Sequence, residues 1–215
     1  MYVKHYMTKN PITIEHDATI SEAVSLMDES GVHRVPVMKN GKLIGIITDG
    51  NIQKATPTKA TSLSVFEINY LLSKSIVSDY MTKNVVTCES EILLEQAVEI
   101  MKTKKVSCLP VVDNNELVGI ITESDLFEAF TDLLGFNKRG SSRITIDIRE
   151  DKLGVMARLT SLVKAQGIGI TNVAIYREQL PLQVVLLVDS LEIDGLLQAF
   201  ADDDFKVSHV LKHKE

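Results

Sequence analysis

The chain has 215 residues, of which 45% are hydrophobic and 24% charged, with a formal net charge of −6. These values are typical of a globular protein with a sizeable core. The acidic balance, the absence of tryptophan and the lack of a long basic run disfavour broad binding to nucleic acids or anionic membranes, although a compact site for a small anion is compatible with them.

The sequence does not indicate targeting to a membrane. The first residues, "MYVKHYMTKNP", lack the apolar core of a signal peptide, and the longest apolar stretch, "VVLLV" at 184–188, is too short to span a bilayer. The only cysteines, Cys88 and Cys108, are interpreted as small buried hydrophobes in a reducing compartment. We therefore expect a cytoplasmic protein.

The chain repeats itself after 74 residues. "YMTKNPITIEHDATISEAVSLMDESGVHRVPVMKNGKLIGIITDGNI" begins at Tyr6, and "YMTKNVVTCESEILLEQAVEIMKTKKVSCLPVVDNNELVGIITESDL" begins at Tyr80. The two segments match without a gap over 47 positions, 19 of them identical. One structural unit is therefore used twice.

Each copy is predicted to fold as β-α-β-β-α. "ITI" and "VTC" are β-prone, and Thr19 followed by Glu22 has capping-box spacing before a helix that Gly31 ends. "RVPV" and "CLPVV" are strands, whose Pro36 and Pro110 suggest a sheet edge or a strand start. The "KNGK" and "DNNE" segments are two-residue hairpin turns, and apolar strands ending in "GIIT" follow them before a final helix.

A connector and a different domain complete the chain. Residues 53–62 are polar and turn-like, and "VFEINYLLSK" predicts a helix. After the linker-like "GFNKRGSS", the segments "RITIDIRE", "VMARLTSLVKAQG", "GITNVAIYRE", "LQVVLLVD", "EIDGLLQAFADD" and "FKVSHVLK" predict β, α, β, β, α and β. This order is ferredoxin-like.

The motifs resemble two known families. The doubled h-P-V-h followed by G-h-h-T-x-x-D is similar to a pair of CBS domains, a Bateman module, and "DKLGVMARLTSLV" with "GITNVAIY" resembles an ACT domain, although Leu153 replaces the usual proline. The order and length of the domains are similar to the acetoin-utilization AcuB-like group. The resemblance implies an α+β fold: a first CBS domain at 1–62, a connecting helix at 63–75, a second CBS domain at 76–135, a linker at 136–142 and an ACT domain at 143–215.

The repeated turn is the candidate ligand site. Thr48 and Thr122 end strands, where a hydroxyl can bond a phosphate or ribose oxygen, and Asp125 can accept both protons of a cis-diol. The resemblance to CBS domains implies the same contacts with adenine nucleotides. Asn51 replaces the aspartate in the first copy, so we expect unequal clefts, with Asp49 as a partial substitute. A capping role for these side chains is compatible with binding.

The other residues predicted to contact a nucleotide surround this turn. His33 and Arg34 precede Pro36 and are candidates for the phosphates, whereas Ser107 and Cys108 stand there in the second copy. The remaining candidates are Ile12, Thr13, Ile14, Val86 and Thr87 as a wall against the adenine, with Pro110, Gly119, Ile120 and Ile121.

Other chemistry is not indicated. We find no Ser-His-Asp order, P-loop or HExxH motif, and expect no enzyme, no catalytic cofactor and no metal site. Gly154 and Asn172 are the candidates for an amino-acid ligand of the ACT part, which could instead serve only for dimerisation.

Two functional hypotheses therefore stand. The first is a homodimeric regulatory sensor whose CBS pair binds AMP, ADP or ATP and relays this to the ACT domain. The second is an amino-acid sensor or dimerisation module with the CBS pair as scaffold.

Overall fold

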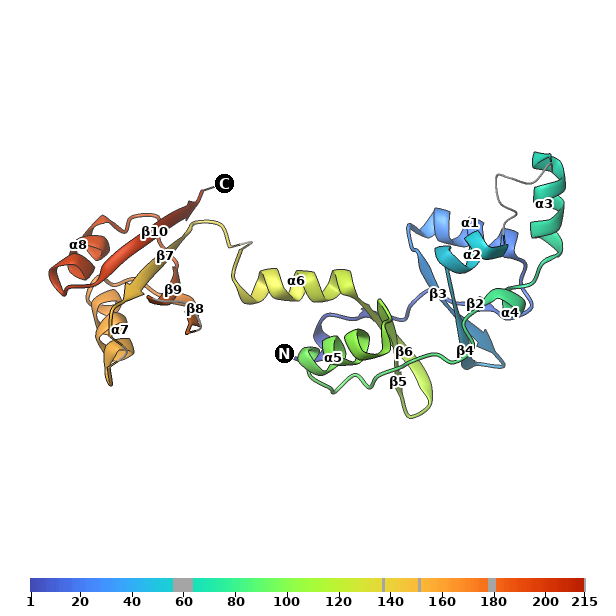
Figure 1. Cartoon of the computed structure of the whole chain (residues 1–215), viewed down its shortest axis with the longest axis horizontal. Coiled ribbons are helices and arrows are strands. Elements are labelled where there is room, and N and C mark those ends of the chain that lie inside the picture. The colour runs from blue at the N-terminus through green and yellow to red at the C-terminus, as the bar shows by residue number, and fades with distance from the viewer. Residues whose placement is uncertain (56–63, 137, 151, 178–180, 215) are drawn as a thin grey trace. The chain divides into compact units, whose positions relative to one another are not determined.

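The computed structural model describes residues 1–55, 64–136, 138–150, 152–177 and 181–214, and it divides into two compact units, Met1–Phe127 and Glu128–Glu215 (Figure 1). The predicted polar turn at 53–62 lies mostly outside the described residues. Each unit has a sheet or sheets of its own and is described separately.

The first repeat has the predicted β-α-β-β-α order of elements, and the second has this order without the first strand. The first repeat contains β2 (Ile14–Glu15), α1 (Ile20–Ser30), β3 (Arg34–Lys39), β4 (Lys42–Thr48) and α2 (Asp49–Ala55). The second contains α5 (Leu94–Lys104), β5 (Cys108–Asp113), β6 (Glu116–Thr122) and α6 (Glu123–Leu133), and α3 (Val65–Lys74) and α4 (Val77–Tyr80) connect the repeats. The "VTC" segment predicted as a strand makes a single bridge, from Cys88 to Val111.

Local sequence signals account for how these elements begin and end. The Thr19 hydroxyl accepts from the Glu22 backbone and the Glu22 carboxylate accepts from Thr19, and Gly31 ends α1 in the left-handed conformation, as predicted. Asn40 and Gly41 both have positive φ, which confirms the tight hairpin between β3 and β4.

Pro36 and Pro110 lie in the middle of β3 and β5, so of the two predicted positions, a sheet edge or a strand start, the strand start is wrong for both. β5 is at the edge of its sheet, but β3 lies between β2 and β4. Pro36 is tolerated there because its cross-strand partner, Ile46, exchanges both backbone hydrogen bonds with Thr82 on the other side.

The start of each repeat crosses over to the other repeat. η1 (Val3–His5) and β1 (Thr8–Lys9) lie against the second repeat, where β1 pairs with β6, while Thr82 pairs with Ile46 of β4 (Figure 1). Ile46, Ile120 and Cys108 form a buried cluster in which the two repeats touch. The two repeats are therefore interlocked by backbone as well as by apolar side chains.

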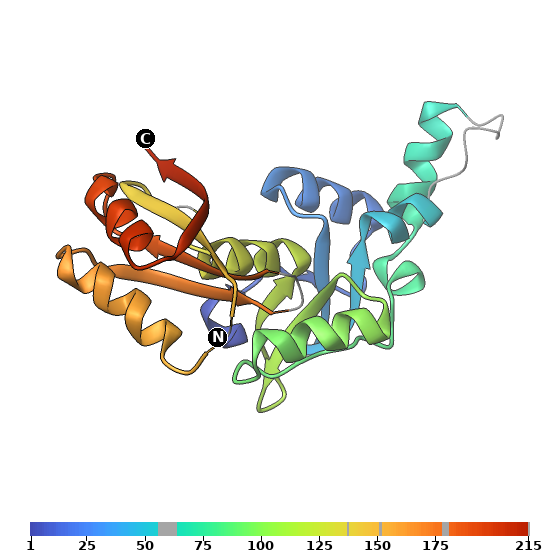
Figure 2. The ribbon, with the colours of Figure 1, turned by 60° about the vertical axis from the view of Figure 1, so that its left-hand side comes forward.

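The second unit is a four-stranded antiparallel sheet with two helices on one face (Figure 2). The strand order β10-β7-β9-β8 with a βαββαβ sequence is the ferredoxin-like arrangement that was predicted. Its elements are β7 (Ser141–Ile148), α7 (Val155–Ala165), β8 (Ile170–Tyr176), β9 (Leu182–Val188), α8 (Asp194–Asp202) and β10 (Lys206–His213). Ser141 and Ser142, assigned to the linker from sequence, belong to β7, whereas Asn137 lies outside the described residues.

Candidate functional site

The repeated turn of the first CBS-like copy is closed by Asn51. Thr48 is the last residue of β4, and its backbone N–H and hydroxyl both donate to Asn51 Oδ1, at 3.0 and 2.7 Å. The Asn51 backbone N–H donates in return to the Thr48 hydroxyl at 3.3 Å. The side chains therefore cap α2, which is the structural role anticipated for them.

Asp125 closes the second turn with the same pattern. The Thr122 backbone N–H and hydroxyl donate to Asp125 Oδ2 at 2.7 and 2.8 Å, and the Asp125 backbone N–H lies 3.5 Å from the hydroxyl oxygen. The Thr-x-x-Asn and Thr-x-x-Asp turns are thus geometrically equivalent.

The two turns differ in what they leave for a ligand. Asp125 is half-buried, and among the described residues its Oδ1 receives no hydrogen bond, so this oxygen is available as an acceptor. The corresponding group of Asn51 is an amide nitrogen, which only donates. A diol can therefore be held by a carboxylate in the second repeat but not in the first.

The two basic residues of "VHRVPV" do not act as a pair. His33 Nδ1 lies 2.8 Å from Asp49 Oδ2 in the same repeat, with both side chains largely exposed. Asp49, predicted to substitute for the missing aspartate, is therefore engaged by His33. Arg34 turns the other way and its Nε donates to the Ser107 hydroxyl at 3.2 Å in the second repeat.

Arg34 occupies the place between the two turns. It is the cross-strand partner of Thr48, while Ser107 immediately precedes Cys108, the cross-strand partner of Thr122. Through its hydrogen bond to Ser107, Arg34 of the first repeat thus connects the end of β4 with the end of β6 in the second repeat. Of the two predicted phosphate-binding residues, Arg34 is the one that donates a hydrogen bond to the other repeat.

The other residues predicted to contact a nucleotide differ in exposure, and several of them are buried against other parts of the protein. Ile121 is fully buried, and Gly119 lies against Met7 and the Thr8 carbonyl. Ile120 belongs to the cluster between the repeats, and Ile14 packs on the core of the first repeat. Pro36 and Pro110 are buried, Ile12, Thr13 and Thr87 are exposed, and Val86 is half-buried.

Both cysteines are buried free thiols. Burial, followed by the nearby Asp113 and Glu89 carboxylates, raises the pKa of Cys88 to about 11. Burial also raises the pKa of Cys108, while the Arg34 guanidinium acts in the opposite direction. Among the described residues, no group of three His, Cys, Asp or Glu is placed to hold a metal ion.

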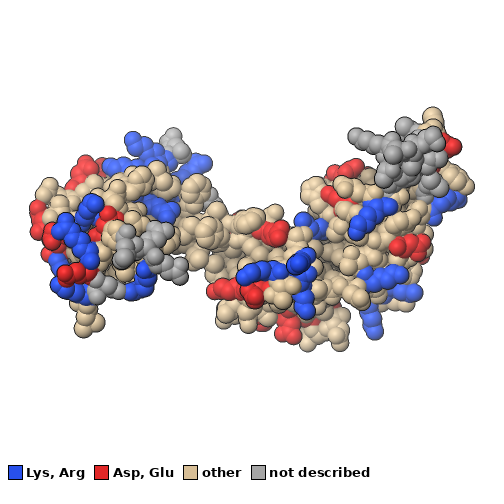
Figure 3. All heavy atoms as spheres, viewed as in Figure 1, with Lys and Arg blue, Asp and Glu red and all other residues tan. Residues whose placement is uncertain are grey.

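Charge on the visible face is mixed. Figure 3 shows Lys and Arg interspersed with Asp and Glu across this face. This face therefore has no broad basic surface, and an anion-binding site on it would depend on individual cations.

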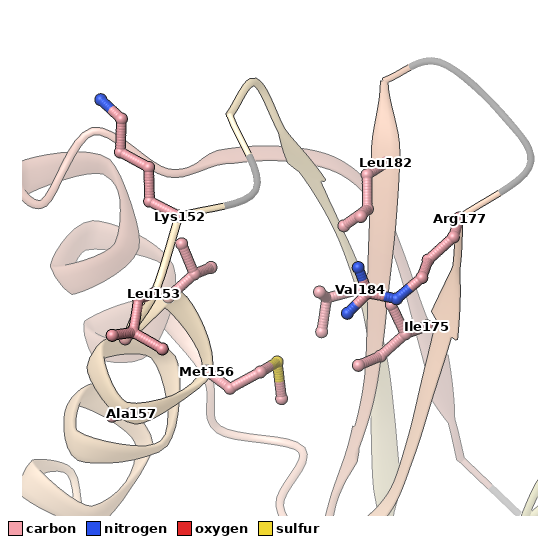
Figure 4. A pocket seen from close by; sticks show the side chains of 10 residues that line it. Lys152, Leu153, Met156, Ala157, Ile175, Arg177, Leu182 and Val184 are labelled. Carbon is pink, nitrogen blue, oxygen red and sulfur yellow. The ribbon is translucent and has the colours of Figure 1, made fainter.

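The second unit has a cavity that sequence reasoning identified only in part. Gly154, at φ 93°, precedes α7 and lines a cavity of about 530 Å³ together with residues of β8 and β9 (Figure 4). Asn172, the other predicted ligand residue, pairs with Leu187 and donates to the Leu133 carbonyl. Because Leu186 faces the helices, Leu187 and Asn172 lie on the opposite face, so Gly154 and Asn172 do not share a site. Asp151, in the same predicted turn, lies outside the described residues.

The cavity residues that the sequence did not predict include Met156, Ile175, Arg177, Leu182 and Val184. The sequence contains only a weak signal for this cavity. The segment "NVAIYR" alternates like a strand, but this alternation does not show that α7 leaves one end of the strand uncovered.

The tandem architecture and its doubled turn agree with the family comparison. The CBS domain profile matches residues 3–57 and 77–132, which is more than half of the chain. The chain belongs to the CBS domain family.

Curated relatives match mainly this region. A homoserine O-acetyltransferase from Methanococcus vannielii is 37% identical over 131 residues, which are 60% of this chain and 25% of that enzyme. The CBS domain-containing protein YhcV from Bacillus subtilis is 33% identical over 124 residues, which are 58% of this chain and 81% of YhcV. The chain thus spans about a quarter of the length of the acetyltransferase.

Solved structures of CBS domain pairs are similar to this chain. A pair in complex with 5′-methylthioadenosine and S-adenosyl-L-methionine is 30% identical, with a TM-score of 0.50, and the match covers 60% of this chain and 99% of that one. CBSX2 in complex with AMP is 25% identical, with a TM-score of 0.51, and the match covers 62% of this chain and 98% of CBSX2. A Vibrio cholerae protein named for acetoin utilization (AcuB) is 28% identical, with a TM-score of 0.53, and the match covers 64% of this chain and 96% of that one. None of the described helices is long and apolar enough to cross a membrane.

Proposed function

We propose that this protein is a regulatory sensor that binds an adenosine-containing ligand, with AMP, ADP and ATP as the first candidates, between its two CBS repeats. The observation that carries the proposal is the hydrogen bond from Arg34 to Ser107, which places a guanidinium between two Thr-capped turns. Similar CBS pairs have been solved with adenosine ligands, which supports the same ligand class here.

Each group has a role suited to its chemistry. The Oδ1 atom of Asp125 accepts from the ribose hydroxyls while Oδ2 holds the turn. The Thr122 and Thr48 hydroxyls bond ribose or phosphate oxygens, and Arg34 binds a phosphate. His33, paired with Asp49, contributes less because its partner is already a carboxylate.

The two clefts are unequal in this proposal. Hydrogen bonds to charged groups contribute roughly 1.5–3 kcal/mol, whereas those between neutral groups contribute about 0.5–1.5 kcal/mol. The cleft that contains Asp125 therefore binds ribose more tightly than the cleft that contains Asn51.

Isothermal titration of the full chain with AMP, ADP, ATP, methylthioadenosine and S-adenosylmethionine tests this. We expect saturable heat with at least one of them, and a larger loss of affinity for Asp125→Ala than for the matched Asn51→Ala. Absence of heat and of any melting shift with all five at millimolar concentration would refute the ligand class, and equal losses would refute the asymmetry.

The wider role follows from this site. We propose that ligand binding changes the packing of the repeats around Ile46 and Ile120, and that the C-terminal unit, an ACT-like domain, receives the signal in a homodimer. A link to acetoin or central carbon metabolism is proposed from the likeness to the Vibrio cholerae protein.

A second candidate function uses the C-terminal unit alone. Its ferredoxin-like strand order and the left-handed Gly154 before α7 favour an amino-acid-sensing or dimerisation module, with the CBS pair as scaffold. Thermal shift with a panel of amino acids separates the candidates, since only the second expects stabilisation by one of them.

A further inference from the structure

The cavity in the C-terminal unit arises from an incomplete layer. β8 is the edge strand, and its Val173 and Ile175 pair with the core residues Leu186 and Val184, so they face the side on which the helices lie. They nevertheless remain 45% and 39% exposed. The helix layer stops short of this strand and leaves a space of about 530 Å³ beside the first turn of α7.

The interior of this space is apolar. In Figure 4 the side chains of Met156 from α7, Ile175 from β8, and Leu182 and Val184 from β9 converge on it. Such a lining favours a ligand that buries hydrocarbon.

The two cations at the cavity are oriented differently. The Arg177 guanidinium is directed into the space, whereas Lys152 points away from it (Figure 4) and forms an ion pair with Glu150. A guanidinium has five donors, so it can hold a carboxylate in a bidentate manner while keeping another contact.

The described residues that line this cavity carry charge of one sign. Among the described residues that line this cavity, none is acidic. The neighbouring cavity of about 420 Å³ is different, because Asp147, Glu150, Asp203 and Asp204 all line it. A ligand ammonium group would find no carboxylate partner among the described residues of the first cavity.

We propose that this cavity binds a small aliphatic monocarboxylate that lacks an ammonium group, with the carboxylate on Arg177 and the hydrocarbon among Met156, Ile175 and Val184. The inference does not depend on nucleotide binding by the CBS pair. It also differs from the second candidate function, which requires a zwitterionic amino acid.

Three probes of similar shape test the inference on the full chain by isothermal titration. Isocaproate carries the carboxylate, leucine adds an α-ammonium, and isohexanol has no charge. We expect isocaproate to bind about tenfold or more tightly than either of the others, because a single charged hydrogen-bonding group is worth roughly this factor.

Variants assign the binding to this cavity. Arg177→Gln should weaken isocaproate binding by about 10- to 100-fold. Met156→Glu, which puts a carboxylate into the lining, should abolish it. Lys152→Gln and Arg149→Gln are matched controls, since the first cation points away and the second lines only the neighbouring cavity, and each should leave the affinity within about threefold.

The outcomes are decisive in both directions. Selective isocaproate binding that Arg177→Gln weakens and Arg149→Gln does not would support the inference. Binding of leucine as tight as that of isocaproate would overturn it in favour of an amino-acid site, and so would an absence of binding by all three probes or an equal loss in both arginine variants. A titration with AMP in parallel shows whether the CBS site is intact, so failure here is distinct from failure of the nucleotide proposal.

Discussion

The two CBS repeats show how one sequence pattern can keep its geometry while its chemistry diverges. Both turns use a threonine to cap the following helix, and the two sets of hydrogen bonds differ by a few tenths of an ångström. One turn is closed by an amide and the other by a carboxylate, and the interrepeat arginine comes only from the first copy. The fold constrains oxygen positions, and it leaves the charge of each turn to vary.

The repeats also differ in how they are held together. Both glycines of the "GIIT" strands lie against a methionine from the other repeat, Gly45 against Met81 and Gly119 against Met7. At Gly119 a backbone atom, the Thr8 carbonyl oxygen, also lies close, because β1 pairs with β6 there. The second repeat thus has a backbone neighbour at this position, whereas the nearest atoms in the first repeat belong to a side chain.

Alanine at each glycine should produce the largest difference between the repeats. A Cβ at Gly119 would lie 2.6 Å from Met7 Sδ and 3.0 Å from the Thr8 carbonyl, whereas all the close atoms at Gly45 belong to the Met81 side chain. We expect Gly119→Ala to lower the free energy of unfolding by about 1–3 kcal/mol and Gly45→Ala by less, because a side chain moves more easily than a paired strand. Urea denaturation followed by circular dichroism measures both.

Double mutants sharpen this comparison. Met81→Ala should relieve the cost of Gly45→Ala almost completely, whereas Met7→Ala should relieve Gly119→Ala only in part, since the Thr8 carbonyl remains. Complete relief in both repeats would show that the backbone contact is unimportant.

Substitutions of the cap should have intermediate effects on stability. Asp125→Ala removes two hydrogen bonds to Thr122 and should cost about 1 kcal/mol of unfolding free energy. Asp125→Asn should cost only a few tenths, because Asn51 shows that an amide oxygen makes the same bonds at 3.0 and 2.7 Å. A loss as large for asparagine as for alanine would contradict the equivalence of the turns.

The sequence predicted well those features that depend on local chemistry. The Thr19–Glu22 capping box, the Asn40–Gly41 hairpin and α3 at Val65–Lys74 all agree with the structure. The ferredoxin-like strand order also followed from the order of elements. In each case the signal consists of residues close in sequence, whose spacing fixes backbone conformation.

The sequence did not predict features that depend on which neighbouring residue a side chain contacts. His33 and Arg34 are adjacent, yet consecutive residues of an extended segment point to opposite sides, and they contact Asp49 and Ser107 respectively. Asn172, predicted together with Gly154 as a ligand residue, lies on the other face because the bulge between Ile170 and Asn172 shifts the alternation of β8. The cavity beside α7 depends on the breadth of a helix layer, which periodicity does not encode.

The contacts of the two basic residues allow a smaller effect to be measured. A double-mutant cycle of Arg34→Gln with Ser107→Ala should give a coupling of about 0.5–1.5 kcal/mol, because this hydrogen bond is half-buried and involves a charged donor. The matched cycle of His33→Gln with Asp49→Ala should give about 0–1 kcal/mol, since that pair is largely exposed. A larger coupling for the histidine pair would reverse the order proposed for the two contacts.

The cysteines should give an effect that appears only at alkaline pH. Because burial raises the pKa of Cys88 to about 11, above the unfolded value of about 8.5, the thiol form is favoured by folding. Its contribution to stability is therefore complete below pH ~8.5 and is lost as the pH rises towards 11. Cys88→Ala should flatten the alkaline decline in unfolding free energy, measured by urea denaturation between these pH values, relative to the unsubstituted chain.

The reactivity of Cys108 provides an internal contrast with Cys88. Arg34 opposes the rise in the pKa of Cys108, so Arg34→Gln should slow alkylation of Cys108 by iodoacetamide in the folded protein and leave alkylation of Cys88 unchanged. Equal slowing of both thiols would mean that Arg34 acts on the stability of the whole unit and not on the neighbouring sulfur, and the placement of that guanidinium between the two turns would lose its chemical significance.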